Sequence, residues 1–169
     1  SIIGKGRSYG LEAEAEYNRE KLQLTAYYTL SWNERRFEEL WYDWYPDRND
    51  NRHKLTLMAN YRFSGRFDVY AGWNWHSGNR TTVEGYQSHQ FGSPNNLSLP
   101  DYHRLDLGMN FRKTTRKGNE SIWNVSVYNA YCRMNTLFAN VQYNDFETTK
   151  GITYGIVPII PSFSYTLKF

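Results

Sequence analysis

Long apolar runs are missing from this chain. No stretch approaches the roughly 20 consecutive apolar residues that a membrane-spanning helix needs, and the mean hydropathy is −0.78. Transmembrane helices are therefore excluded. The first four residues, Ser-Ile-Ile-Gly, also lack the apolar core of a secretory signal peptide. If the protein is exported, we expect the sequence to be a mature form or a fragment.

Cysteine and clustered charge are also scarce. The single cysteine, Cys132, excludes an intrachain disulfide. The 20 Lys and Arg residues are interspersed with 17 Asp and Glu residues, without the basic face that nucleic-acid binding requires. No two of the four histidines have metal-ligand spacing, and no G-x-S-x-G nucleophile motif occurs. We therefore expect no metal, no cofactor, no enzyme activity and no nucleic-acid partner.

Aromatic residues, in contrast, are abundant: they make up 18% of the chain, with 15 Tyr, 9 Phe and 6 Trp. Transmembrane β-barrels combine aromatic girdles with weak hydropathy in each strand. The clearest example is the C-terminus, where Phe163, Tyr165, Leu167 and Phe169 alternate with polar residues and so share one face of a strand. A last strand that ends on Phe resembles the signal that outer-membrane barrels present to their assembly machinery.

The same alternation with a period of two recurs along the chain and predicts seven strands. They span about residues 8–17, 22–32, 53–63, 67–76, 101–112, 121–131 and 162–169. A strand of about ten residues crosses a bilayer when it is tilted. Short turns alternate with long loops at about 33–52, 77–100 and 132–156. In outer-membrane barrels the short turns are periplasmic and the long loops extracellular.

We therefore predict an all-β fold, a transmembrane antiparallel β-barrel with its apolar face toward lipid and its polar face toward the lumen. The residues expected near mid-bilayer on the lipid side are Leu24, Leu57, Val69, Leu107 and Val127. The charged residues expected in the lumen are Glu12, Glu14, Glu16, Arg62, Asp68, Arg104 and Asp106. These charges either guide substrate and contact a plug domain or, more simply, form cross-strand ion pairs.

An odd number of strands is a physical problem. Bacterial single-chain barrels have even strand numbers, and an open sheet in lipid would leave unpaired backbone groups at its edges. The favoured explanation is that the N-terminal part of the barrel is absent from this sequence. The alternative is a missed strand around Leu137–Tyr143, which would restore an even count and give a complete barrel of about eight strands.

Four longer motifs carry a family resemblance. They are Tyr-Tyr-Thr-Leu-Ser-Trp at 27–32, Pro-Asp-Tyr-His-Arg-Leu-Asp-Leu at 100–107, Val-Tyr-Asn-Ala-Tyr at 127–131 and Val-Pro-Ile-Ile-Pro-Ser-Phe at 157–163. Together they resemble the C-terminal barrel of TonB-dependent outer-membrane receptors, especially the versions found in Bacteroidetes-type bacteria. The resemblance covers about residues 8–169.

The resemblance implies a barrel of about 22 strands around a plug, of which residues 1–169 would be about the last seven strands, without plug or N-terminal strands. It implies location in the bacterial outer membrane and active import of a scarce nutrient, such as a siderophore, vitamin, oligosaccharide or peptide. The implied partners are the rest of the barrel and its plug, the TonB complex through the absent N-terminal part, the barrel assembly machinery, outer-membrane lipid and a surface lipoprotein.

Two further interpretations follow from the residues. The first long loop contains Trp41, Tyr42, Trp44 and Tyr45 beside carboxylates, a composition that suits capture of a sugar, siderophore or peptide. The alternative is a solvated loop whose aromatic side chains lie at the membrane interface. A complete small barrel acting as anchor, adhesin or narrow porin remains the second functional hypothesis. It requires residues 8–17 to pair directly with residues 163–169.

Overall fold

The computed structural model describes residues 3–82, 93–115, 118–143, 149–155 and 157–169, and no side chain in 137–154 is described. All regular structure in these ranges is β. The strands are β1 (Lys5–Arg19), β2 (Leu22–Phe37), β3 (Trp41–Pro46), β4 (His53–Arg62), β5 (Phe67–His76), β6 (Arg80–Thr81), β7 (Leu97–Ser98), β8 (Tyr102–Thr114), β9 (Glu120–Tyr128), β10 (Thr136–Tyr143), β11 (Thr149–Gly155) and β12 (Ile160–Lys168).

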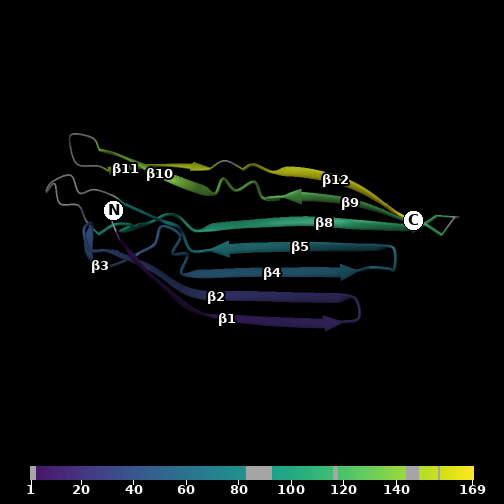
Figure 1. Ribbon diagram of the computed structural model, residues 1–169. Coiled ribbons are helices and arrows are strands. Elements are labelled where there is room, and N and C mark those ends of the chain that lie inside the picture. The colour runs from purple at the N-terminus through teal and green to yellow at the C-terminus, as the bar shows by residue number, and fades with distance from the viewer. Residues whose placement is uncertain (1–2, 83–92, 116–117, 144–148, 156) are drawn as a thin grey trace.

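Seven long strands form one antiparallel sheet in the order β1-β2-β4-β5-β8-β9-β12, so every strand pairs with its neighbours in the meander (Figure 1). All seven strands predicted from the sequence are confirmed. The pairings run without interruption along each strand, for example from Lys54↔His76 to Arg62↔Asp68 between β4 and β5. Regular registers of this kind fix which side chains share a face.

One face of the sheet is apolar and the other polar, as predicted. Leu24, Ala59, Ala71, Leu107 and Val127 are successive partners in one row across five strands. The adjacent row on the opposite face contains Thr25, Met58, Gly72 and Asp106. Because successive side chains of a strand point to opposite faces, the two rows lie back to back.

Burial is inverted relative to a water-soluble domain. In β8 the apolar residues Leu107, Met109 and Phe111 are 42%, 44% and 47% exposed, whereas the polar residues Asn110 and Arg112 between them are half-buried. Among the described residues only Tyr45 and Leu99 are buried hydrophobics, while Asp50, Asn51, Asp68, Ser121 and Asn129 are buried polar residues. A sheet with this pattern needs an apolar solvent on its outer face.

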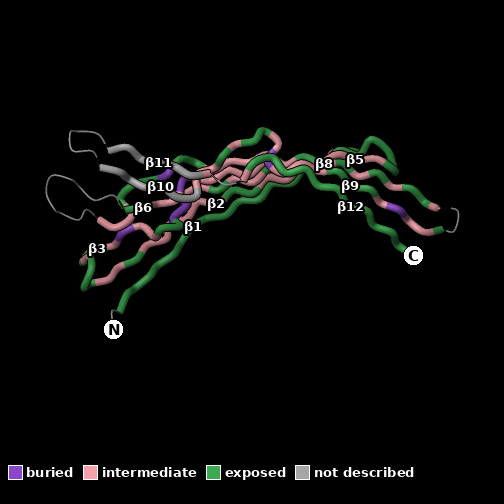
Figure 2. Tube along the Cα trace, turned by 90° about the horizontal axis from the view of Figure 1, so that it is seen from above, coloured by how far each residue is buried: buried purple, intermediate pink, exposed green. Residues whose placement is uncertain are grey.

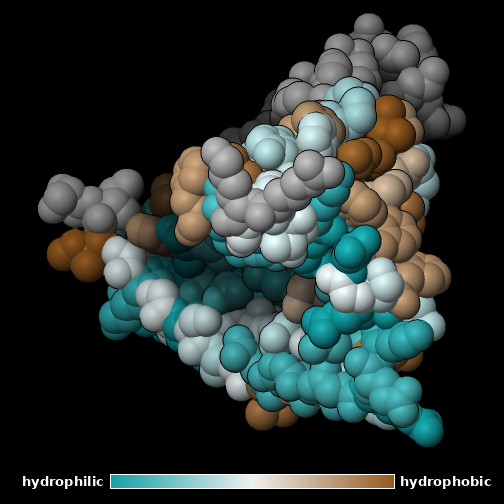
Figure 3. Space-filling model, turned by 90° about the vertical axis from the view of Figure 1, so that its right-hand side faces the viewer, coloured by the Kyte–Doolittle hydropathy of each residue, from teal (hydrophilic) through white to brown (hydrophobic). Residues whose placement is uncertain are grey.

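The sheet is curved, and its polar face lines the hollow. Figure 2 shows the arch that the strands form when the sheet is seen edge-on. Figure 3 shows hydrophilic residues inside the hollow and hydrophobic residues gathered on the flank. We call the hollow side the inner face and the apolar side the outer face. The predicted orientation of Leu24, Leu57, Val69, Leu107 and Val127 is therefore confirmed.

The two ends of the sheet differ. At what we call the turn end, short connections join β1 to β2, β4 to β5 and β8 to β9, and the C-terminus lies there too (Figure 1). The first of these turns has only Glu20 and Lys21 between its strands, with Glu20 at a φ of 40°. The longer connections, β3 and the β10–β11 hairpin lie at the opposite end, the loop end.

Two predictions about the loops need correction. Residues 33–52 are not one loop: β2 continues to Phe37, and β3 pairs with this extension of β2. The suspected strand around Leu137–Tyr143 exists as β10, but it pairs with β11 in a separate hairpin and does not enter the main sheet. The meander therefore keeps seven strands.

The sheet is open. Residues of β12 pair with β9, from Ile160↔Tyr128 to Lys168↔Glu120, as predicted. Within the described residues β1 pairs with β2 alone and β12 with β9 alone, so residues 8–17 and 163–169 are not partners. The pairing that a complete small barrel requires is thus not found.

Candidate functional site

A polar cluster occupies the inner face toward the loop end, where β5, β8 and β9 meet. Arg104 donates from Nε to Asp106 at 2.9 Å, and its Nη1 contacts the hydroxyls of Tyr102 at 3.0 Å and Tyr128 at 2.6 Å. The Arg104 guanidinium also lies 4.0 Å from the centre of the Tyr128 ring. The cluster therefore presents aromatic faces and hydroxyl groups around one fixed cation.

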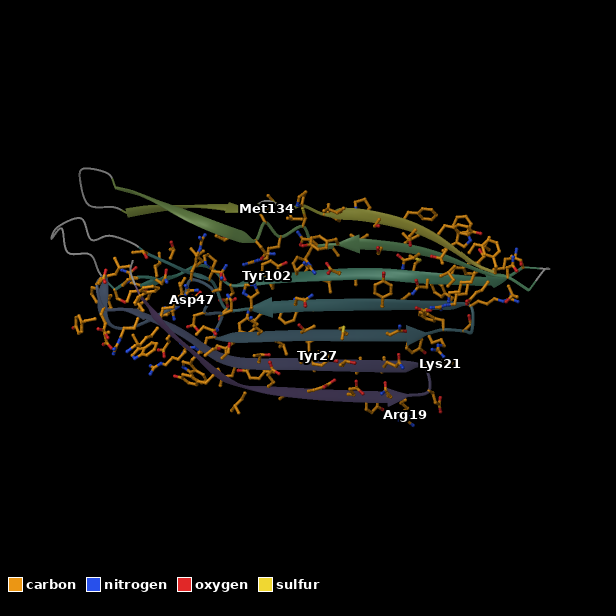
Figure 4. All side chains as sticks on the ribbon, in the orientation of Figure 1. Arg19, Lys21, Tyr27, Asp47, Tyr102 and Met134 are labelled. Carbon is orange, nitrogen blue, oxygen red and sulfur yellow. The ribbon has the colours of Figure 1, made fainter. Side chains whose placement is uncertain are left out.

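The neighbouring strand extends this cluster. His76 is the register partner of Tyr102, and their rings stack with centres 4.7 Å apart and an angle of 3° between the planes. The other Asp106 oxygen accepts a hydrogen bond from the backbone N–H of Asn129 at 3.0 Å. The position of Arg104 is thus anchored to the end of β9. We call His76, Tyr102, Arg104, Asp106 and Tyr128 the inner aromatic cluster; Tyr102 is labelled in Figure 4.

A second network lies on the inner face toward the turn end. Asp68 is only 2% exposed and accepts hydrogen bonds from Arg112 and, at 2.9 Å, from Asn110. Asn124 continues the network to Asn110 at 2.8 Å and to the Tyr70 hydroxyl at 3.1 Å. These bonds join three adjacent strands and satisfy a carboxylate that would be costly to bury alone.

A glycine makes room for the centre of this network. A side chain on Gly108 would overlap the Tyr70 ring, because that ring lies across the glycine on the neighbouring strand. Covering a strand glycine with an aromatic ring from the adjacent strand protects the backbone that the glycine leaves open.

The predicted lumen charges all lie on the inner face, but in different settings. Arg104 and Asp106 belong to the inner aromatic cluster, and Asp68 pairs with Arg112, which sequence reasoning missed. Arg62 is the register partner of Asp68. Glu12, Glu14 and Glu16 follow one another along the exposed edge strand β1 opposite Thr29, Tyr27 and Thr25, and the structure assigns them no ion pair with any described residue.

The predicted aromatic ligand residues do not form one surface. Trp41, Tyr42, Trp44 and Tyr45 all lie in β3, but they differ in exposure and in the groups they contact. Tyr45 is 7% exposed, and the Arg7 guanidinium covers the Trp44 ring at 4.3 Å. Trp41 and Tyr42 stack with ring centres 6.0 Å apart, and Tyr42 is the most exposed of the four.

A polar groove of about 620 Å³ opens beside β1 at the loop end. Its inner wall includes Ser8, whose hydroxyl contacts Asn33 at 2.6 Å, and Arg35, which pairs with Asp47. Figure 4 shows Asp47 at this end of the sheet. The groove offers hydrogen-bonding groups of both kinds close to the edge where β1 has no described partner.

Buried asparagine and aspartate side chains fix the loop bases. Asp50 accepts from the backbone N–H of Asn33 at 2.9 Å and from Arg52 at 2.9 Å. Asn129 donates to the carbonyls of Arg133 and Val157 at 2.9 and 2.8 Å. Asn129 also has a φ of 54°, which ends β9 earlier than the predicted 121–131 strand.

Comparison with known proteins now identifies the family. A family model described as "TonB dependent receptor-like, beta-barrel" matches residues 1–152. The chain belongs to this family. Searches of curated proteins and of solved structures found no match.

Membership in the TonB-dependent receptor family explains the inverted burial. Members of the family are outer-membrane transporters whose barrels enclose a plug and act with TonB. The outer face of the sheet is accordingly the face for lipid, and the inner face belongs to the lumen. In the parts of the chain that the structure describes, no helix is long and apolar enough to span a membrane, and no group of three or more His, Cys, Asp or Glu side chains could hold a metal ion.

Aromatic residues mark both ends of the outer face in the way such receptors require. Toward the loop end Tyr9 stacks on Trp32 at 5.3 Å and His53 lies 6.4 Å from Trp75. Toward the turn end lie contacts such as Trp123–Tyr165 at 4.7 Å. Two girdles with Leu, Ala, Val and Met between them delimit the hydrocarbon layer.

Proposed function

We propose that the chain is the C-terminal part of the barrel of a TonB-dependent receptor that imports a scarce nutrient across the bacterial outer membrane. The observation that carries the proposal is the open sheet with an apolar convex face and a polar concave face, in a chain of this family. A siderophore, vitamin, oligosaccharide or peptide is the proposed cargo. The work of transport is assigned to the inner face, and no enzymatic step is proposed.

The rest of the barrel would attach at the two unpaired edges of the sheet. Unpaired backbone groups in hydrocarbon cost several kcal/mol each, so β1 and β12 need neighbours that the described residues do not supply. We propose that earlier strands of the same protein pair with both edges and that a plug lies against the inner face. TonB would act through that plug. Figure 1 shows both edge strands with one side free.

In this arrangement the turn end is periplasmic and the loop end extracellular. The terminal residues Phe163, Tyr165, Leu167 and Phe169 then lie where the barrel assembly machinery would engage them after secretion. The β10–β11 hairpin stands on the cell surface, where a surface lipoprotein would meet the receptor.

The inner aromatic cluster is the proposed contact for the cargo on this wall. Tyr and His faces combined with hydroxyl donors suit a polar organic ligand such as a sugar or a peptide. Tyr42 at the loop end and the polar groove beside Arg35 would receive it first. Trp41, Trp44 and Tyr45 support the loop end around them.

The test is energised uptake by cells that carry the full-length receptor. Labelled siderophore, cobalamin, oligosaccharide and peptide are offered to cells with the intact receptor and to cells with a deletion variant. The variant lacks the short box by which the plug of such receptors binds TonB. We expect uptake of one ligand class that disappears with the box. Uptake that persists at the same rate without the box would contradict the proposal.

A further inference from the structure

An arginine–tryptophan cluster interrupts the outer face at the loop end. Besides Arg7 over Trp44 at 4.3 Å, the Arg36 guanidinium lies 5.8 Å from the same ring, and Arg52 lies 4.9 Å from the centre of the Trp32 ring. We call Arg7, Trp32, Arg36, Trp44 and Arg52 the outer cationic cluster. Three guanidinium groups would be costly in hydrocarbon, so we place them at the level of the polar headgroups.

Each of these arginines has more N–H hydrogen-bond donors than its one carboxylate partner can accept. Each has one carboxylate partner: Arg7 bonds to Glu34, Arg36 to Glu38 and Arg52 to Asp50. A guanidinium has five N–H donors, and the side chains of Arg7, Arg36 and Arg52 are 46%, 28% and 30% exposed, so an anion can approach them. Lys5, the register partner of Arg36, adds a fourth positive charge, against three carboxylates. The cluster is thus one positive charge in excess and short of acceptors.

An apolar groove lies below this cluster on the same strands. It has a volume of about 480 Å³ and runs over the small side chains of Ala15, Ala26, Ala59 and Ala71, with Leu24, Leu57 and Trp73 among its walls. Trp32 and Ala26 are six positions apart on β2, about 20 Å along a strand and roughly 14 Å along the normal of the bilayer at a tilt of about 45°. That depth equals one leaflet of hydrocarbon, about 15 Å.

We propose that these two features together bind one phosphorylated lipid of the outer leaflet, with its phosphate on the outer cationic cluster and an acyl chain in the apolar groove. The inference rests on the orientation given under the proposed function. Phosphate oxygens complement the planar guanidinium donors, and the groove below requires a chain of hydrocarbon attached to the same molecule. A free anion would satisfy only the cluster, and an acidic protein would leave the groove unfilled.

The test is lipid binding by the purified full-length receptor in mild detergent, measured by native mass spectrometry. Dilauroyl phosphatidic acid is the probe, and dilauroyl glycerol, with the same chains and no phosphate, is its matched control. We expect tighter binding of the phosphatidic acid. The double variant R36Q/R52Q should lose about tenfold in affinity for it, as two partly exposed charge-assisted contacts would give.

The matched control variant is R19Q/K113Q, which removes two positive charges from the outer face at the turn end; Figure 4 labels Arg19 there. It should bind phosphatidic acid like the wild type. A59L, which fills the groove, should weaken binding with the cluster intact. Resistance of each variant to unfolding in cold SDS verifies that the barrel has assembled.

Three results would overturn the inference: equal binding of the two lipids, an equal loss in both double variants, or full displacement of the lipid by an equimolar amount of inorganic phosphate. Each is independent of transport. Uptake without selective lipid binding would refute this inference alone, and selective lipid binding without uptake would refute the proposed function alone.

Discussion

The effect of a substitution at a single position of this sheet depends on the solvent that its face meets. Leu24 and Thr25 are consecutive in β2, yet they belong to rows on opposite faces, one beside Ala59 and the other beside Met58. On the outer face a charge must enter hydrocarbon, whereas on the inner face it meets water and polar neighbours. Adjacent residues therefore respond differently to the same substitution.

Leu24→Arg in the full-length receptor should lower the free energy of unfolding by about 2–4 kcal/mol, because the charge lies near mid-bilayer. Thr25→Arg is the matched control and should change it by less than about 1 kcal/mol. Urea unfolding from phospholipid vesicles measures both. Equal losses in the two variants would mean that the faces are not distinguished by lipid.

Asp68 is the most consequential carboxylate of the inner face. Asp68→Ala leaves Arg112 and Asn110 without their acceptor, and we expect a loss of about 1–3 kcal/mol. Glu16→Ala, on the exposed inner side of β1, should stay within about 0.5 kcal/mol. The same urea titration compares them, and a loss at Glu16 as large as that at Asp68 would contradict the role assigned to the buried network.

Some of the side-chain positions on the inner face could be predicted from the sequence. The period of two places Arg104, Asp106 and Asp68 inward correctly. Tyr102 and Tyr128 lie in the same phase, but Tyr is common on both faces here, so the pattern alone could not distinguish a cluster from a girdle. The hydrogen bond from Asn129 to the Val157 carbonyl joins positions far apart in the chain, and no local sequence pattern predicts such a contact.

At the scale of elements, the seven strands of the meander could be predicted, whereas outside them the alternation indicated only β10. Alternation arises where one side of a strand meets lipid and the other water, which covers all seven strands of the meander. The end of β2 and β3 extend past the girdle of Tyr9 and Trp32, where neither face meets hydrocarbon. Their sequences lose the alternation, and residues 33–52 therefore resembled a loop.

The last strand gives a prediction of its own. Trp123 of β9 packs against Phe163 and Tyr165 of β12, while Phe169 is 98% exposed and contributes little packing. Deleting Phe169 from the full-length receptor should reduce the amount of assembled barrel in the outer membrane much more than it reduces ligand affinity of the barrels that form. Quantitative immunoblotting of heat-modifiable receptor, with ligand binding on the same membranes, separates the two. Deletion without loss of assembled receptor would remove the assembly role from this residue.

For the whole molecule, the placement of short and long connections sets the orientation. Protease added to intact cells should cut the full-length receptor within 38–52, 77–101 or 129–159 and leave the turns at Glu20–Lys21 and 63–66 intact. Mass spectrometry of the released peptides locates the cuts. Cleavage confined to the short turns would reverse the orientation of the sheet.

The most direct test of the central claim, that the apolar face meets lipid while the polar face lines the lumen, is a spin-label scan of β8. Single cysteines are introduced at each position from 104 to 111 of the full-length receptor except Gly108, where a side chain would overlap the Tyr70 ring. Cys132 is replaced by serine, and the labelled protein is reconstituted in bilayers. We predict that accessibility to oxygen alternates with a period of two and peaks at positions 105, 107, 109 and 111, while a water-soluble nickel reagent never reaches these four. Oxygen maxima at positions 104, 106 and 110, or no alternation at all, would contradict the account.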